Sequence, residues 1–138
     1  MNPKAIQYLD LGIDNVALDL RCADFLAVPP QPVDAVLGNP PYVRLRQLPA
    51  PQQALALQTA LTATGEPMDP AGSLWMPFLQ HALEFLKPGG RLGFVLPYDF
   101  TYVRYARPLW QLLGRRFGSL RVIRTHERLF GDIYQEVL

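Results

Sequence analysis

The chain has 138 residues, of which 49% are hydrophobic and 18% charged, and its net charge is +1. This balance is typical of one globular domain and excludes a disordered chain. No apolar run approaches the roughly 18 residues of a membrane span. The N-terminal MNPKAIQYLD lacks the pattern of a secretion signal, and Cys22 is the single cysteine. We therefore expect a protein of the reducing cytoplasm without disulfides.

Apolar runs and turn residues predict alternating strands and helices. RCADFLAV (residues 21–28) and VDAVLG (33–38) are predicted to be short buried strands, separated by PPQP. Residues 51–65 have helical periodicity between proline and glycine. Because of those flanking residues, we expect the whole segment 43–72 to be a loop insertion.

A second helix is predicted after this insertion. Ser73 is expected to cap a helix that runs to about Lys87, where KPGG (87–90) is a stop signal. Its apolar positions lie on one face; they are Trp75, Leu79, Ala82, Leu83 and Leu86.

The last third of the chain continues the alternation. A third strand is predicted at 91–97, a helix from about Val103 to Phe117, and a fourth strand at 119–126. This order is typical of an α/β fold with a mainly parallel sheet. In such sheets, ligands bind outside the carboxyl ends of the strands.

The Asn39-Pro40-Pro41-Tyr42 motif stands at such a strand end, just after residues 33–38. The prolines stiffen the loop and donate no backbone N–H. The Asn39 side-chain oxygen is an acceptor, and the Tyr42 ring is a flat stacking surface. The motif therefore suits a planar group with an amine, such as a nucleobase. An ordinary turn is the alternative, since Asn and Pro are common turn formers and the chain has 14 prolines.

Charge is unevenly spread along the chain. Residues 1–100 have a balance of −3 and residues 101–138 a balance of +4, and eleven of the thirteen cations are arginine. Arginine suits phosphate and base contacts. The arginines of the predicted helix could bind DNA or form an ordinary solvated face; they are Arg104, Arg107, Arg115 and Arg116. No metal site is predicted, because His81 and His126 lack partners at ligand spacing.

Asn39-Pro40-Pro41-Tyr42 after a hydrophobic strand resembles the catalytic motif of S-adenosylmethionine-dependent N6-adenine DNA methyltransferases. Further stretches are similar to the TaqI-like branch of that family, found in restriction–modification systems. They are ADFL (23–26), SLWMPFL (73–79), LKPGGRLGFV (86–95) and ERLF (127–130). Their order and spacing agree with the family from about residue 20 to 138.

The resemblance implies cofactor and target-base roles for the matched residues. Asp24 is expected to accept a hydrogen bond from the amine of the cofactor adenine. Phe25 is expected to contact the adenine ring, and Phe78 to close the other side of the pocket. In the motif, Asn39 and the Pro40 carbonyl are expected to hold the N6 hydrogens of the target adenine. The aromatic residues expected at the flipped base are Tyr42, which stacks on it, and Phe130.

The implied reaction transfers the cofactor's methyl group to N6 of an adenine flipped out of double-stranded DNA. Two acceptors out of the ring plane draw the amine toward a tetrahedral shape and localise its lone pair. Catalysis then rests on positioning and charge stabilisation. Stacking on Tyr42, worth about 1–3 kcal/mol, offsets part of the cost of flipping.

Other substrates and a non-catalytic role stay open. The same motif occurs in methyltransferases that modify a glutamine amide of release factors, and in some RNA methyltransferases. The long segment 43–72 and the Phe130 motif favour DNA. A remnant that only binds DNA or a partner chain through its arginines is a further alternative.

The chain departs from the family in what it lacks. A complete enzyme carries, before these stretches, a Gly-rich strand–loop–helix for the methionine end of the cofactor, and an acidic residue for the ribose. No G-x-G pattern occurs here. We therefore expect residues 1–138 to form one partial catalytic domain of the class I, Rossmann-like methyltransferase fold. Its missing N-terminal half, or a target-recognition domain, is an expected partner besides DNA, and activity in isolation is not expected.

Overall fold

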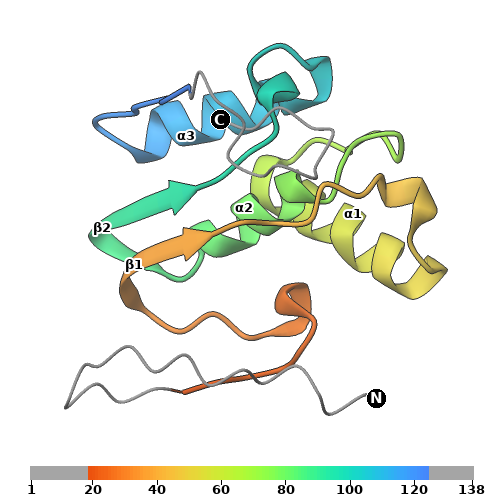
Figure 1. The fold of residues 1–138 in the computed structure, drawn as a ribbon, viewed down its shortest axis with the longest axis horizontal. Coiled ribbons are helices and arrows are strands. Elements are labelled where there is room, and N and C mark those ends of the chain that lie inside the picture. The colour runs from red at the N-terminus through yellow and green to blue at the C-terminus, as the bar shows by residue number, and fades with distance from the viewer. Residues whose placement is uncertain (1–18, 125–138) are drawn as a thin grey trace.

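The computed structural model describes residues 19–124, which form helices packed beside a small parallel sheet (Figure 1). This agrees with the predicted α/β class. The strands and α-helices are β1 (Val33–Gly38), α1 (Ala50–Thr64), α2 (Trp75–Leu83), β2 (Leu86–Phe94) and α3 (Arg107–Arg116). Short 3₁₀ turns at Phe25–Ala27, Leu45–Gln47, Tyr98–Thr101 and Arg104–Ala106 connect them. No helix in the described part of the chain is long and apolar enough to span a membrane.

The sheet consists of β1 and β2, and β1 has the predicted bounds. The strands are parallel, so both arrows in Figure 1 point the same way and their carboxyl ends are adjacent. Gly38 at the end of β1 pairs with Phe94 at the end of β2. On β1, Val36 is half-buried whereas Leu37, on the opposite face, is exposed. The two faces of β1 therefore differ in exposure to solvent.

The KPGG segment lies inside β2 instead of ending a helix. The helix predicted to run to about Lys87 ends at Leu83, and β2 begins at Leu86. The register passes from Val33–Leu86 directly to Ala35–Arg91, so residues 87–90 bulge out of the ladder. Gly89 has φ +78°, a left-handed conformation that glycine adopts readily. Proline and glycine thus shape a bulge at the start of the strand.

The strand predicted at 21–28 does not form, and this is a correction. Asp24 Oδ1 accepts a hydrogen bond from the Leu26 N–H at 3.1 Å, and the Ala27 N–H donates to the Asp24 carbonyl at 3.0 Å. These bonds close a 3₁₀ turn over Phe25–Ala27. Aspartate favours such local bonds over the ladder of a strand.

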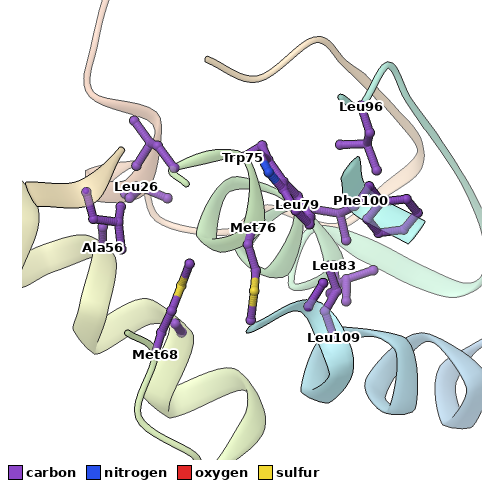
Figure 2. Packing of buried hydrophobic residues seen from close by; sticks show 14 of the residues in the cluster. Leu26, Ala56, Met68, Trp75, Met76, Leu79, Leu83, Leu96, Phe100 and Leu109 are labelled. Atoms are coloured by element: carbon purple, nitrogen blue, oxygen red, sulfur yellow. The ribbon is translucent and has the colours of Figure 1, made fainter. Parts of the chain in front are cut away.

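The hydrophobic core lies between the three helices and the turn that follows β2 (Figure 2). α2 contacts both α1 and β2. The α2 residues predicted on its apolar face are buried: Trp75, Leu79, Ala82 and Leu83. Met76, Pro77 and Gln80 are buried as well, so α2 is enclosed on more than the predicted face. Leu86 is half-buried at the start of β2 instead.

The segment 43–72, expected to be a loop insertion, contains a helix that packs into this core. α1 covers the predicted helical residues and ends at Gly65, which has φ +75°. Ala56 and Ala60 on α1 are fully buried. These small side chains allow α1 to lie close against α2, with which it makes contact.

The C-terminal part differs from the prediction in two places. The helix predicted from Val103 begins at Arg107, because Pro108 fits the first turn of a helix and a 3₁₀ turn precedes it. Of the strand predicted at 119–126, the described residues 119–124 form no strand. Phe130 and the rest of the ERLF motif lie outside the described residues.

Candidate functional site

The Asn39–Tyr42 motif lies at the carboxyl end of β1, as predicted, beside the end of β2. Asn39 is exposed, Pro40 is buried and the Tyr42 ring is half-buried against the core. The Asn39 amide is therefore accessible to solvent, while the adjacent Pro40 is packed against the protein. This arrangement gives a fixed backbone and an accessible side chain.

The Tyr42 hydroxyl ties this loop to the neighbouring strand. Its oxygen lies 3.0 Å from the carbonyl oxygen of Val95 and 3.1 Å from Asn39 Oδ1. Val95 directly follows β2, and its N–H donates to the Gly38 carbonyl at 2.9 Å. Burial raises the pKa of Tyr42 to about 12, so the hydroxyl keeps its proton at neutral pH. The motif is therefore anchored to the ends of both strands.

The chain after the motif is anchored at the start of α2. The Leu74 N–H donates to the Val43 carbonyl at 2.8 Å, and the Leu45 N–H donates to the Gly72 carbonyl at 2.9 Å. Ser73 does not cap α2 as predicted; its hydroxyl donates to the same Val43 carbonyl at 3.3 Å. This short antiparallel pairing brings Tyr42 and the first turn of α2 into one region.

Gly38, next to Asn39, leaves no room for a side chain. A Cβ built on Gly38 would lie 2.8 Å from Cζ of Phe94. We expect Gly38→Ala to destabilise the fold by about 1–3 kcal/mol, the usual effect of overpacking, because the Phe94 ring or the strand end must shift. Urea unfolding followed by circular dichroism measures this change.

Gly114 is the matched control for this substitution. It lies in α3, and a Cβ there would meet nothing within 4 Å. Because alanine is the better helix former, Gly114→Ala is expected to stabilise by up to about 1 kcal/mol. Equal effects of the two substitutions would show that Phe94 does not pack tightly over Gly38.

An aromatic cluster, which we call the Phe25 cluster, lies where the cofactor-binding residues were expected. It comprises Phe25, Phe78, His81 and Phe85. Phe25 and Phe78 are in direct contact, with ring centroids 5.3 Å apart and planes tilted by 46°. An adenine between two rings would hold them about 7–8 Å apart, given two contacts of about 3.5–4 Å. Phe78 therefore does not lie across a pocket from Phe25; the two rings form one wall.

His81 and Phe85 were not singled out from the sequence, where His81 was considered only as a metal ligand. The His81 ring lies edge-on to Phe25, with centroids 5.0 Å apart, and its Nε2–H donates to the Val28 carbonyl at 2.9 Å. Phe78 and His81 stand three positions apart on α2, whereas Phe85 lies in the turn between α2 and β2. The i, i+3 spacing of Phe78 and His81 was the signal available in the sequence.

Asp24 stands beside this cluster with its carboxylate exposed. One oxygen accepts the Leu26 N–H. A carboxylate has two oxygens and about four acceptor sites, so it retains capacity for a ligand amine. Asp24 directly precedes Phe25 in the chain, so an exposed carboxylate adjoins the Phe25 cluster.

Asp99 and Arg44 are charged residues near the motif that the sequence analysis did not single out. Burial raises the pKa of Asp99, and the nearby Arg44 guanidinium acts in the opposite direction. Arg44 also donates to the Ala71 carbonyl at 2.9 Å. The Arg44–Ala71 hydrogen bond fixes the chain just after the motif to the segment before α2.

The arginines of the last helix have different surroundings. Arg116 pairs with Glu84 at 3.4 Å and donates to the Leu83 carbonyl at 2.9 Å, so it joins α3 to the end of α2. Arg104, Arg107 and Arg115 are exposed. Arg116 therefore has a packing role, and the other three remain on the surface. Among residues 19–124, no three His, Cys, Asp or Glu side chains gather as metal ligands would.

The sequence matches one family over most of its length. A family model described as Eco57I restriction-modification methylase matches residues 24–127. This range contains all of β1, β2 and the three helices. The chain therefore belongs to the Eco57I restriction-modification methylase family, a family of methyltransferases.

Individual relatives agree with this assignment. The Type II methyltransferase M.XhoI of Xanthomonas vasicola is 36% identical over 119 residues, which is 81% of this chain and 21% of that protein. M.PaeR7I of Pseudomonas aeruginosa, also a Type II methyltransferase, is 36% identical over 71% of this chain and 16% of its own length. A release factor glutamine methyltransferase of Gloeobacter violaceus is 31% identical over 76% of this chain and 35% of its own length. The chain thus spans about a fifth of the length of the Type II relatives.

Proposed function

We propose that this chain is the catalytic segment of an adenine-specific DNA methyltransferase, with S-adenosylmethionine as methyl donor. The observation that carries this proposal is the exposed Asn39 amide on an anchored loop at the carboxyl ends of β1 and β2. Family membership supports methyl transfer in a restriction–modification system. The proposed fold of the whole domain is the class I, Rossmann-like methyltransferase sheet, of which β1 and β2 are two adjacent strands.

In this proposal, the chain's own groups act on the target amine. Asn39 Oδ1 and the Pro40 carbonyl accept the two N6 hydrogens and localise the nitrogen lone pair. The Tyr42 ring, and Phe130 beyond the described residues, hold the flipped adenine. Because acceptors are placed before the reaction begins, little reorganisation is needed as positive charge develops on the nitrogen.

The Phe25 cluster and Asp24 fit the adenosine end of the cofactor. The Phe25–Phe78 wall offers aromatic surface to one face of an adenine, and the second Asp24 oxygen can accept from its amine. S-adenosylmethionine would supply an electrophilic methyl group on sulfur. The residues for its methionine end are proposed to come from another part of the enzyme or from a partner subunit.

Calorimetric titration of the chain with S-adenosylmethionine tests the cofactor site. Asp24→Asn is the sharper variant, because its amide oxygen can still accept the Leu26 N–H and preserve the turn. The side-chain NH₂ that replaces the second oxygen then faces the amine of the cofactor adenine, and two donors cannot form a hydrogen bond with each other. We expect binding to weaken by about ten- to a hundredfold, since a hydrogen bond to a charged group contributes about 1.5–3 kcal/mol.

Asp34→Asn is the control, because Asp34 is an exposed carboxylate paired with Lys87 at the other end of β1. It should bind the cofactor as the parent chain does. Equal weakening in both variants would indicate a general charge effect and count against Asp24 as an adenine ligand.

A second candidate function is methylation of a glutamine amide in a release factor. The similarity to the Gloeobacter violaceus enzyme favours it, and an amide nitrogen presents the same two hydrogens to Asn39 and Pro40. Incubation of the complete enzyme that contains this segment with labelled S-adenosylmethionine and either DNA or release factor distinguishes the two. Label in DNA supports the first proposal, and label in protein alone supports the second.

A further inference from the structure

We propose that the Tyr42 hydroxyl is a positioning group that sets the orientation of the Asn39 amide. In this arrangement the hydroxyl donates to the Val95 carbonyl and accepts a hydrogen bond from the Asn39 side-chain NH₂. Asn39 Oδ1 then faces away from Tyr42 and is free to accept from a substrate amine. The inference rests on the proposed function for its purpose, and on the contacts of Tyr42 for its geometry.

The Tyr42 hydroxyl has two oxygen neighbours but a single proton. The Tyr42 oxygen lies within hydrogen-bond distance of two oxygens, at 3.0 Å from the Val95 carbonyl and 3.1 Å from Asn39 Oδ1. A phenol carries one proton and therefore donates to only one of them. If Val95 receives it, the Tyr42 and Asn39 oxygens face each other with no proton between them.

Turning the Asn39 amide about its Cβ–Cγ bond removes this conflict. Its oxygen and nitrogen occupy nearly equivalent positions, so the turn places the NH₂ against the lone pairs of the Tyr42 oxygen. Each group then has a matching partner: NH₂ to hydroxyl, and hydroxyl to carbonyl. Burial holds the pKa of Tyr42 at about 12, so this donor persists at any physiological pH.

Of the two acceptors, the Val95 carbonyl loses more than Asn39 Oδ1 when it has no donor. Val95 follows β2, and its N–H is bonded to the Gly38 carbonyl, so its backbone is fixed by the sheet. The Tyr42–Val95 bond is partly buried, whereas the Tyr42–Asn39 contact is exposed. A partly buried carbonyl that loses its donor is less well solvated by water than an exposed amide, so the loss costs more. The Tyr42 hydroxyl therefore donates its single proton to the Val95 carbonyl.

Amide hydrogen exchange, observed by NMR on the ¹⁵N-labelled chain, tests this assignment. The Asn39 side-chain NH₂ signals are identified as the pair absent from Asn39→Ala. If the NH₂ donates to Tyr42, its exchange with water should be about two- to tenfold slower than that of a free amide, the effect of a bond worth about 0.5–1.5 kcal/mol. Tyr42→Phe keeps the ring and removes the hydroxyl, and should return the exchange to the free value.

Tyr98→Phe is the matched control, because the Tyr98 hydroxyl accepts from Arg124 and has no contact with Asn39 in the described residues. It should leave the Asn39 signals unchanged. Free-amide exchange in the parent chain overturns the proposal, whatever the variants do. Since neither cofactor nor DNA is present, the result decides the orientation of Asn39 independently of which substrate the enzyme methylates.

Discussion

Replacing Asn39 by alanine is expected to abolish methyl transfer while leaving S-adenosylmethionine binding almost unchanged. The side chain is exposed at the carboxyl end of β1, and its proposed acceptor acts on the target amine and not on the cofactor. Loss of one preorganised electrostatic group in an active site lowers turnover by about 10²–10³-fold. Both effects are measured on the complete enzyme that contains this segment: transfer of labelled methyl to DNA for the first, and calorimetric cofactor binding for the second.

Gln111→Ala controls for the removal of an amide from the surface. Gln111 is exposed on α3, and its truncation should change neither transfer nor binding. If Asn39→Ala weakened cofactor binding as much as it lowered transfer, Asn39 would be supporting the fold of the site, and its role as acceptor for the amine would be wrong.

The location of the candidate site could be predicted because it depends on local sequence. An apolar run bounded by turn residues defined β1 with its observed ends, and the rule for parallel sheets placed Asn39 at the functional edge. The spacing of apolar residues also predicted four of the seven buried positions of α2. Both features follow from periodicity within a single element.

The errors arose where a side chain or a glycine changes the path of the backbone. Asp24 closes a turn on the Leu26 N–H, so an apolar run that suits a strand becomes a 3₁₀ turn. The KPGG segment has the composition of a helix stop, yet residues 87–90 bulge from a strand that has already begun at Leu86. In each case the composition indicates that regular secondary structure is interrupted. It does not indicate whether a helix or a strand is the element interrupted.

Contacts between residues far apart in the chain could not be predicted from the sequence. The Tyr42 hydroxyl meets the Val95 carbonyl across 53 positions, and this meeting depends on the register of β1 and β2. That register depends in turn on the bulge at 87–90. The resemblance to a family named Phe25 and Phe78, but only the structure shows that their rings touch and form one wall.

Trp75→Ala is expected to be the most destabilising single substitution proposed here, at about 3–5 kcal/mol. Trp75 is fully buried at the first position of α2, edge-on to Phe100 with ring centroids 5.3 Å apart (Figure 2). Small domains have about 5–15 kcal/mol in total, so this loss is a large share of the whole. Urea unfolding measures it as a lower midpoint.

The candidate site should be affected together with the core. Trp75 directly follows Leu74, whose N–H donates a hydrogen bond to the carbonyl of Val43, the residue after the motif. In Trp75→Ala, we therefore expect the Asn39 side-chain NH₂ to lose its slow exchange at urea concentrations where the parent chain retains it. Tyr102→Ala is the matched aromatic truncation: its side chain is 66% exposed, and the expected change is within about 0.5 kcal/mol. Similar unfolding midpoints for the two variants would mean that the packing of α2 is not what holds the Asn39–Tyr42 loop in place.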